Sequence, residues 1–399
     1  MALKVIGLIA VAGLMGLVLY LMIFGRGPAV TPSGTIEPTT TGSLPTAGDG
    51  TPGSGSTGTP TPGGPGVLTP SPVADGGLTA TTQLTTSGVS RPTITTNGSL
   101  AYYDPRDGKF YTIDANGKVV LLSQATFPSA SNVTFSNHAT SAVVEFPDGS
   151  NVVYDFTSGK QSTLPSHWED FSFSNDSTSI AAKSIGTDSS NRALIVTSAD
   201  GSNARSIAAL GDNNDKVDVN WSPDGSVVGF SKTGITGNAF GQNEVYLIGP
   251  DGEAAGVLIV NGSNFKGLWS PNGANLMYSV ADAGDDYRAS LWYADSRGDR
   301  NGDTRLRISI KTTADKCTFA SASLAYCAVP AEMQAGGGAT GSAINSKDSL
   351  YSISFPSGRS TLVAVPDKTT DMQNLSVSED GRKIYYTDSA GRLNFIQLK

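Results

Sequence analysis

Val217–Ser231 reads VDVNWSPDGSVVGFS and Phe265–Ser279 reads FKGLWSPNGANLMYS, so one pattern occurs twice in the chain. Each copy is an alternating apolar stretch, a tight turn and a second apolar stretch. In the first turn Pro223 presets φ at the second position, Asp224 bonds to local backbone and Gly225 accepts positive φ. The two stretches therefore predict β-hairpins, and the SPDG and SPNG motifs are interpreted as turns that need no ligand.

Five weaker copies of the pattern bring the count to seven. They are PTITTNGSLAYYD from Pro92, VTFSNHATSAVVEF from Val133, FSFSNDSTSIAAKS from Phe171, CTFASASLAYCAV from Cys317 and LSVSEDGRKIYYTD from Leu375. A spacing of roughly 40 to 60 residues is typical of the four-stranded blades of a β-propeller. We therefore expect an all-β fold, a propeller of seven four-stranded blades, with six and eight blades as the alternatives.

Short alternating third strands follow each hairpin, and the seventh unit stops after its third strand at LNFIQL. We expect Thr81–Thr86 to supply its missing fourth strand, because closure between the two ends of a propeller removes an open sheet edge. One position on the first strand is aromatic in five units. These residues are predicted to pack between blades: Phe135, Phe173, Trp221, Trp269 and Phe319.

The hairpins, the LY-type third strands and the Gly turns after them resemble the TolB-like β-propeller repeat, which is related to the tricorn-protease and WD-type propellers. The match covers about residues 78–399 and is strongest over Val217–Ser279. The resemblance implies a domain that binds other envelope proteins or peptides across its faces. The α/β domain that precedes the propeller in TolB itself is absent, and TolB has six blades where seven units are counted here.

Residues Val5–Phe24 form an uncharged apolar run of the length that an α-helix needs to cross a bilayer. We predict a transmembrane signal-anchor helix at residues 1–27, in preference to a cleaved signal peptide. Lys4 before the run favours a cytoplasmic N-terminus. Residues 28–77 are rich in Pro, Thr, Gly and Ser and are predicted to be a disordered linker. Residues 78–399, the propeller, are then expected to be extracytoplasmic at a cell membrane.

The only two cysteines, Cys317 and Cys327, flank the turn of the sixth hairpin. We expect them to be directly opposed on adjacent strands, where a disulfide can form. Such a bond fits an oxidising compartment outside the membrane. Two buried free thiols are the alternative.

The charge balance is acidic, with 27 Lys and Arg against 35 Asp and Glu, which excludes a phosphate-binding surface for nucleic acid. The only histidines, His138 and His167, are not expected to act as general bases, and no Ser or Cys triad is recognised. Three acidic pairs lie in connections and are interpreted as solvated surface, not as catalytic carboxylates: Glu169 with Asp170, Asp215 with Asp218, and Asp285 with Asp286.

Oxygen ligands alternate in one loop, at Asp299, Asn301 and Asp303, as they do in calcium-binding loops. Gly302 is misplaced for an EF-hand, and Arg307 occupies the ninth position of the loop. A weak calcium site and a plain polar turn are both compatible with the pattern. No other cofactor is expected.

The loops between second and third strands lengthen from the third unit onward, which builds up one rim of the propeller, where binding usually resides. The residues predicted to bind are Phe240, Tyr287, Arg288 and Met333 from these loops, with Trp168 and Lys266 from inter-blade connections. We expect a monomeric, non-enzymatic scaffold, tethered outside a prokaryotic membrane, that docks an envelope protein, peptide or wall glycan. The alternative is an extracytoplasmic carbohydrate-active enzyme that uses rim carboxylates.

Overall fold

The computed structural model describes residues 69–114, 116–235, 241–340 and 346–399. The chain divides into two units, residues 1–64 and 65–399, and the described residues belong to the second. The predicted anchor and most of the predicted linker lie outside the described residues. Within the described ranges, no helix is long and apolar enough to cross a membrane.

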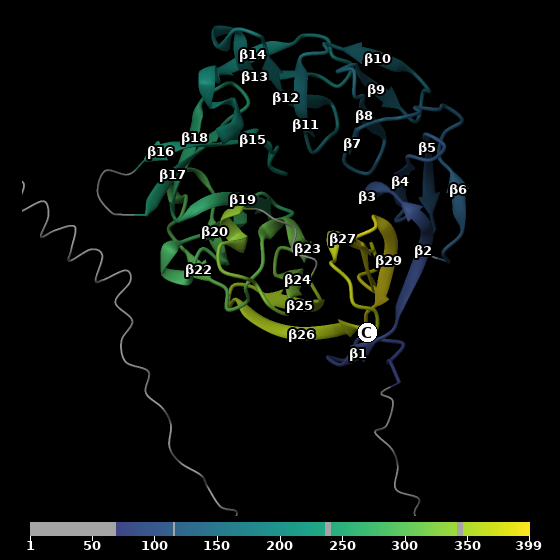
Figure 1. Ribbon diagram of the computed structural model, residues 1–399. Helices are drawn as coiled ribbons and strands as arrows, with labels where there is room; N and C mark the ends of the chain where they lie inside the picture. Colours follow the sequence, from purple (N-terminus) through teal and green to yellow (C-terminus); the bar gives the residue numbers. More distant parts are fainter. Residues whose placement is uncertain (1–68, 115, 236–240, 341–345) are drawn as a thin grey trace, which may run out of the picture. The chain divides into compact units, whose positions relative to one another are not determined.

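Seven sheets, each with four antiparallel strands, are arranged around a central axis, and the first strand of each blade is innermost (Figure 1). Blade one is β3 (Ser90–Ile94), β4 (Leu100–Asp104), β5 (Lys109–Ile113) and β6 (Val119–Leu121). Blade two is β7 (Asn132–Phe135), β8 (Ser141–Glu145), β9 (Asn151–Asp155) and β10 (Gln161–Leu164). Blade three is β11 (Trp168–Phe173), β12 (Ser179–Ile185), β13 (Arg192–Ser198) and β14 (Arg205–Ala209). Blade four is β15 (Val217–Val219), β16 (Gly229–Ile235), β17 (Gln242–Ile248), β18 (Ala254–Asn261).

Blades five and six are β19 (Ser263–Trp269), β20 (Asn275–Ala281), β21 (Ala289–Asp295), β22 (Leu306–Arg307); and β23 (Cys317–Ser321), β24 (Leu324–Pro330), β25 (Asp348–Ser354), β26 (Arg359–Pro366). Blade seven is β27 (Gln373–Val377), β28 (Lys383–Thr387), β29 (Arg392–Gln397) and β2 (Thr81–Gly88). The predicted all-β, seven-bladed propeller is therefore confirmed.

Closure between the two ends of the propeller follows the predicted route. Strand β2 pairs antiparallel with β29, with Thr81 opposite Ile396 and Gln83 opposite Asn394. A second connection was not predicted: β1 (Leu78–Thr79) runs parallel to β26 and adds a fifth strand to blade six. The segment 78–88 thus joins the outer edges of two neighbouring blades.

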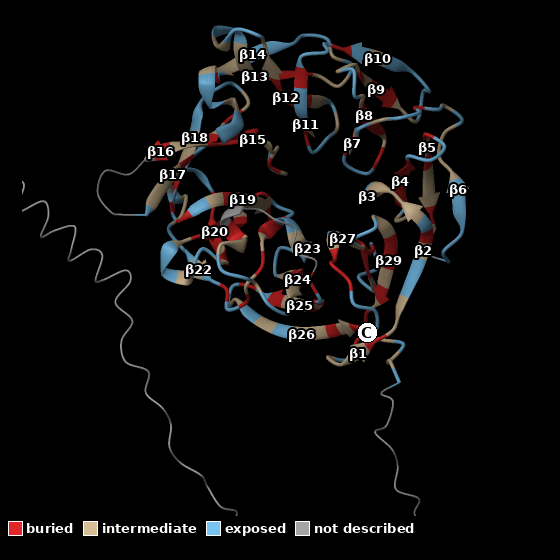
Figure 2. Cartoon of the chain, in the orientation of Figure 1, coloured by how far each residue is buried: buried red, intermediate tan, exposed pale blue. Residues whose placement is uncertain are grey.

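The recurring aromatic residues lie between blades, as predicted. Trp269 of blade five stacks on Phe230 of blade four with ring centroids 5.4 Å apart, and Phe135 of blade two meets Phe110 of blade one at 5.6 Å. Phe173, Trp221 and Phe319 each belong to or pack against a core cluster that includes the preceding blade. Figure 2 shows buried residues within the blades, and they are concentrated on second strands such as β4, β20 and β28. Burial between blades therefore supplies the core.

The SPDG motif forms a hydrogen-bonded turn. Ser222 Oγ donates to Asp224 Oδ1 at 2.6 Å, the amide of Gly225 donates to the Ser222 carbonyl at 2.9 Å, and Gly225 has a φ of 79°. In blade six, Cys317 and Cys327 are directly opposed on β23 and β24 and are joined by a disulfide. Both features are local consequences of hairpin geometry.

Candidate functional site

Two long loops on the built-up face are bonded to each other and form one surface. The first, residues 282–288, joins β20 to β21 and contains η3 (Ala283–Asp285); the second, residues 331–347, joins β24 to β25 and contains α2 (Gly337–Thr340). We call residues 282–288 and 331–338 the loop platform. It brings together three of the predicted binding residues, Tyr287, Arg288 and Met333, which lie in two neighbouring blades.

Backbone hydrogen bonds hold the platform together. The Asp286 carbonyl accepts from the amide of Gly336 at 2.8 Å, and the Tyr287 carbonyl accepts from the amide of Gly338 at 2.9 Å. A Cβ at residue 338 would lie 2.4 Å from the Ala289 nitrogen, so glycine is required for this approach. The glycine at position 338 is thus explained by the close contact of the second loop with blade five.

Tyr287 is held in an unusual backbone conformation. Both Asp286 and Tyr287 have positive φ, 51° and 55°, a region that costs on the order of 1 kcal/mol or more for a residue with a side chain. Tyr287 is nevertheless 47% exposed, so burial of its side chain compensates for the strain only in part. Strain that presents an exposed aromatic ring is typical of a binding surface.

Arg288 and Met333 fix the platform to blade five. Arg288 Nε donates to the Met333 carbonyl at 2.9 Å, and its Nη1 bonds to Asp286 Oδ2 at 2.6 Å. Met333 Sδ accepts from the amide of Ala289 at 3.0 Å. Both side chains therefore position the loops, and Tyr287 is the more accessible of the three.

The other three predicted binding residues do not join the platform. Trp168 and Lys266 were predicted in inter-blade connections, and this placement is wrong because both lie in innermost strands, β11 and β19. Bulges with positive φ at Asp170 and Asn264 extend these strands toward the rim. Trp168 is only 7% exposed and packs in the core. Phe240 lies outside the described residues.

Cationic side chains engage members of all three acidic pairs that the sequence analysis interpreted as solvated surface and not as catalytic carboxylates. The buried Lys183 binds both Glu169 and Asp170, and Lys232 lies 2.8 Å from Asp218. Asp285 binds Arg307 and Lys311, while Asp286 binds Arg288. The hydrogen bond from Lys311 foremost lowers the pKa of Asp285, which keeps it ionised and unsuited to act as a general acid near neutral pH.

The loop considered for calcium is used for internal hydrogen bonds. It contains η4 (Gly298–Arg300), and the side-chain nitrogen of Asn301 donates to the carbonyls of Gly298 at 2.6 Å and Ala255 at 3.2 Å. Among the described residues, no three His, Cys, Asp or Glu side chains are grouped so that they could hold a metal ion. The hydrogen bond to the Ala255 carbonyl ties this turn to the outer strand of blade four.

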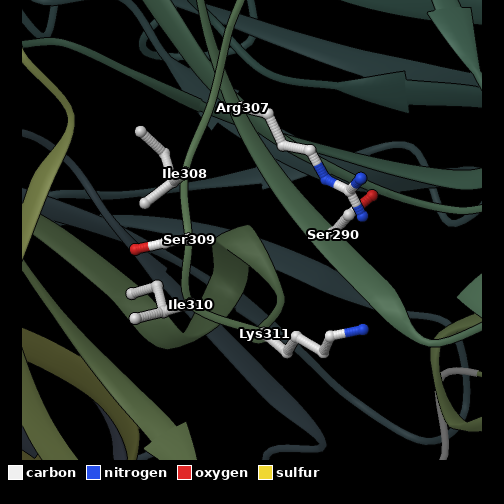
Figure 3. Close-up of a pocket in the computed structure, with 6 residues that line it drawn as sticks. All are labelled: Ser290, Arg307, Ile308, Ser309, Ile310 and Lys311. Atoms are coloured by element: carbon white, nitrogen blue, oxygen red, sulfur yellow. The ribbon is translucent and has the colours of Figure 1, made fainter.

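A pocket of about 240 Å³ opens beside the platform, on the outer side of blade five (Figure 3). It is lined by Ser290 and the segment 307–311. The pocket exists because β22 ends at Arg307, after which the chain turns away to bury Ile308 and Ile310 in the core between blades five and six. The alternation in LRISIK, residues 306–311, is the signal in the sequence that could have predicted this pocket.

Two cations are held in place in this pocket. Arg307 Nη2 donates to Asp285 Oδ2 at 3.1 Å, and Lys311 Nζ bonds to the other carboxylate oxygen. The Arg307 guanidinium also lies 5.8 Å from the centroid of the Trp292 ring, a cation–π contact. Figure 3 shows both side chains extending to the same side of the segment. The charges of Asp285, Arg307 and Lys311 add up to one net positive charge, which can bind an anionic group.

The fold and the site define a seven-bladed β-propeller with a raised loop platform on one face and a cationic pocket beside it. No family model matches the chain, and no curated protein has a matching sequence.

Solved structures resemble it at low sequence identity. An oligogalacturonate lyase in complex with manganese has a TM-score of 0.56 and 14% identity, with 80% of this chain and 93% of that chain covered. The Swd1 β-propeller domain from Myceliophteria thermophila has a TM-score of 0.54 and 11% identity, with 80% of this chain and 100% of that chain covered. Tricorn protease has a TM-score of 0.50 and 9% identity, with 80% of this chain and 34% of that chain covered. These likenesses show the fold alone, and propeller folds carry both enzymes and binding domains.

Proposed function

We propose that this chain is a non-enzymatic binding scaffold, a propeller tethered outside a prokaryotic membrane by its N-terminal segment. Its loop platform docks an envelope protein, peptide or wall glycan. The observation that carries the proposal is the strained and exposed Tyr287 on a platform bonded from two blades. Rigid presentation of an aromatic side chain reduces the entropy lost on binding.

The extracytoplasmic location is supported by the disulfide between Cys317 and Cys327, since such bonds persist in oxidising compartments. The predicted anchor and linker would hold the propeller at a distance from the bilayer. The TolB-like resemblance agrees with an envelope partner.

The carbohydrate-active enzyme is the second candidate, and the likeness to an oligogalacturonate lyase is the observation in its favour. The ion pairs of Asp285 and Asp286 weigh against it, because a carboxylate engaged by a cation is a poor proton donor. A distant likeness of fold does not transfer an activity.

Affinity capture from the producing cell's envelope, with the full chain as bait, tests the proposal. The expected result is a stoichiometric partner that is retained by the wild type and lost on Tyr287→Ala. Tyr246→Ala is the matched control, because Tyr246 is also exposed, at 37%, but lies in β17 away from the platform. Equal capture by all three proteins would contradict docking at the platform.

An activity assay separates the two candidates. The full chain is incubated with envelope glycans, and the products are followed by mass spectrometry. Turnover that is abolished by Asp285→Asn or Asp286→Asn would support the enzyme and overturn the scaffold.

A further inference from the structure

We infer that the pocket beside the platform binds the singly charged acid group of an anionic glycan, an inference that rests on the proposed function and names its ligand class. The pocket lies next to the platform because Asp285, in the first platform loop, holds both of its cations. A ligand on Tyr287 and one in the pocket would therefore share the same face of blade five.

The two cations are preorganised for an anion. Asp285 and the Trp292 ring restrain Arg307, so little side-chain entropy remains to be lost on binding. Among the described residues, only Nη2 of Arg307 bonds to an acceptor, Asp285, so the Nε and Nη1 donors of the guanidinium are left for a ligand. The single net positive charge of Asp285, Arg307 and Lys311 matches one carboxylate or one phosphodiester.

The surroundings favour a glycan over an extended peptide. A peptide strand would need the backbone groups at the outer edge of β21. The Ala289 amide already donates to Met333 Sδ, and the Leu291 carbonyl accepts from the amide of Ile308 at 2.8 Å. At about 240 Å³ the pocket is smaller than the sites of drug-sized ligands, so it fits one compact unit. An acidic sugar unit meets these limits.

Isothermal titration calorimetry on the full chain tests the inference with four probes. They are a uronic acid oligomer, a glycerol phosphate oligomer carrying phosphodiesters, a neutral oligosaccharide of equal length, and a poly-glutamate peptide. We expect one of the two acidic oligomers to bind and the neutral oligosaccharide not to bind. The acidic oligomer that binds shows whether the pocket recognises a carboxylate or a phosphodiester. Binding of the peptide alone, or of the neutral sugar equally well, would overturn the glycan assignment.

Substitutions then locate the binding. Arg307→Gln and Lys311→Gln are each expected to weaken the affinity for the acidic oligomer about tenfold, the scale of one hydrogen bond to a charged group. Arg307→Lys, which keeps the charge but not the planar donor edge, should lose less. Arg305→Gln is the matched control, because Arg305 is exposed and donates to the Ile259 carbonyl of blade four at 2.6 Å.

Unchanged affinity in both pocket variants would overturn the inference, provided that their melting curves match the wild type. A variant that melts early is replaced by Arg307→Lys together with a salt titration of wild-type binding. Affinity that does not change with salt concentration would also overturn the inference. The proposed function fails separately. If Tyr287→Ala still captures the envelope partner, docking at the platform is wrong, whereas capture lost on Tyr287→Ala and kept on Arg307→Gln removes only the inference.

Discussion

Thr81, in the strand that follows the predicted linker, is the direct cross-strand partner of Ile396, close to the C-terminus. This pairing completes blade seven from both ends of the propeller, so the ring depends on contacts between residues far apart in sequence. The Ile396 side chain is fully buried in the core of blades six and seven.

Truncation of Ile396 is expected to weaken this closure. Ile396→Ala should lower the free energy of unfolding by about 3 kcal/mol, since it removes buried methyl groups and leaves a cavity. Urea denaturation followed by tryptophan fluorescence measures the change. Val119→Ala, at a 46% exposed position in β6, should stay within about 0.5 kcal/mol. Similar effects of the two substitutions would show that burial of the Ile396 side chain does not stabilise the closure.

The disulfide is expected to stabilise blade six. Replacing both cysteines, as Cys317→Ala with Cys327→Ala, should cost about 2 to 3 kcal/mol, because the short loop between them is no longer constrained in the unfolded chain. Thiol titration of the denatured protein, isolated from its cell with the thiols blocked, should detect free cysteine only after reduction. Two titratable thiols without reductant would argue against an oxidising compartment.

A lysine between two buried aspartates predicts a pH dependence of stability. Lys316 Nζ lies 2.6 Å from Asp348 Oδ2 and 2.5 Å from Asp371 Oδ1, and the Asp348 carboxylate is fully buried. Burial foremost, opposed by Lys316, raises the pKa of Asp348. The contribution of Asp348 to the stability of the folded state is therefore fully present below its ordinary pKa of about 4 and is lost as the pH rises through the raised pKa.

Removing the lysine should expose this dependence. Lys316→Met is expected to cost about 3 to 5 kcal/mol near pH 7, because two buried carboxylates lose their cation. The loss should shrink toward about pH 4, because the raised pKa of Asp348 lets its buried carboxyl take up a proton in the folded protein and so depend less on the cation. Chemical denaturation at the two pH values measures it. Lys311→Met, with a side chain 43% exposed, should cost at most about 1 kcal/mol. A loss that grows on acidification would contradict the proposed balance of charges.

Relieving the strain at Tyr287 is expected to separate stability from binding. Tyr287→Gly should leave the protein as stable as the wild type or more stable by about 0.5 kcal/mol, because glycine adopts positive φ without strain. Partner capture should fall at the same time. Tyr246→Gly, in the regular strand β17, should instead destabilise by about 1 kcal/mol. Destabilisation by both substitutions would mean that the Tyr287 ring contributes to folding and not only to recognition.

Asp285 should stabilise the platform only while it is ionised. Its pKa is lowered, so its contribution is present above the ordinary pKa of about 4 and is lost as the pH falls through the lowered value. Asp285→Asn is expected to cost about 0.5 to 1 kcal/mol near pH 7 and less at about pH 2. Thermal melts at the two pH values measure this. An equal cost at both would mean that the carboxylate acts by shape and not by charge.

Periodicity determined much of the fold from the sequence alone. Seven repeats of a hairpin with aromatic residues at one position specify seven blades and the packing between them, because strand alternation and turn chemistry act over a few residues. The same locality places Cys317 opposite Cys327, and the incomplete seventh unit led to Thr81–Thr86 as its partner. The parallel pairing of Leu78 with Val365 carries no such pattern, so it was not foreseen.

Only the tertiary structure decided the site. The platform joins Tyr287 to Gly338 and Arg288 to Met333, and the pocket joins Asp285 to Arg307, contacts between loops that have no repeat and no alternation. Trp168 was placed in a connection because a bulge that lengthens a strand leaves little trace in the sequence. Blade geometry follows from local hydrogen bonds and burial. The surface between two blades depends on how their loops meet in space, and a single sequence does not carry that information.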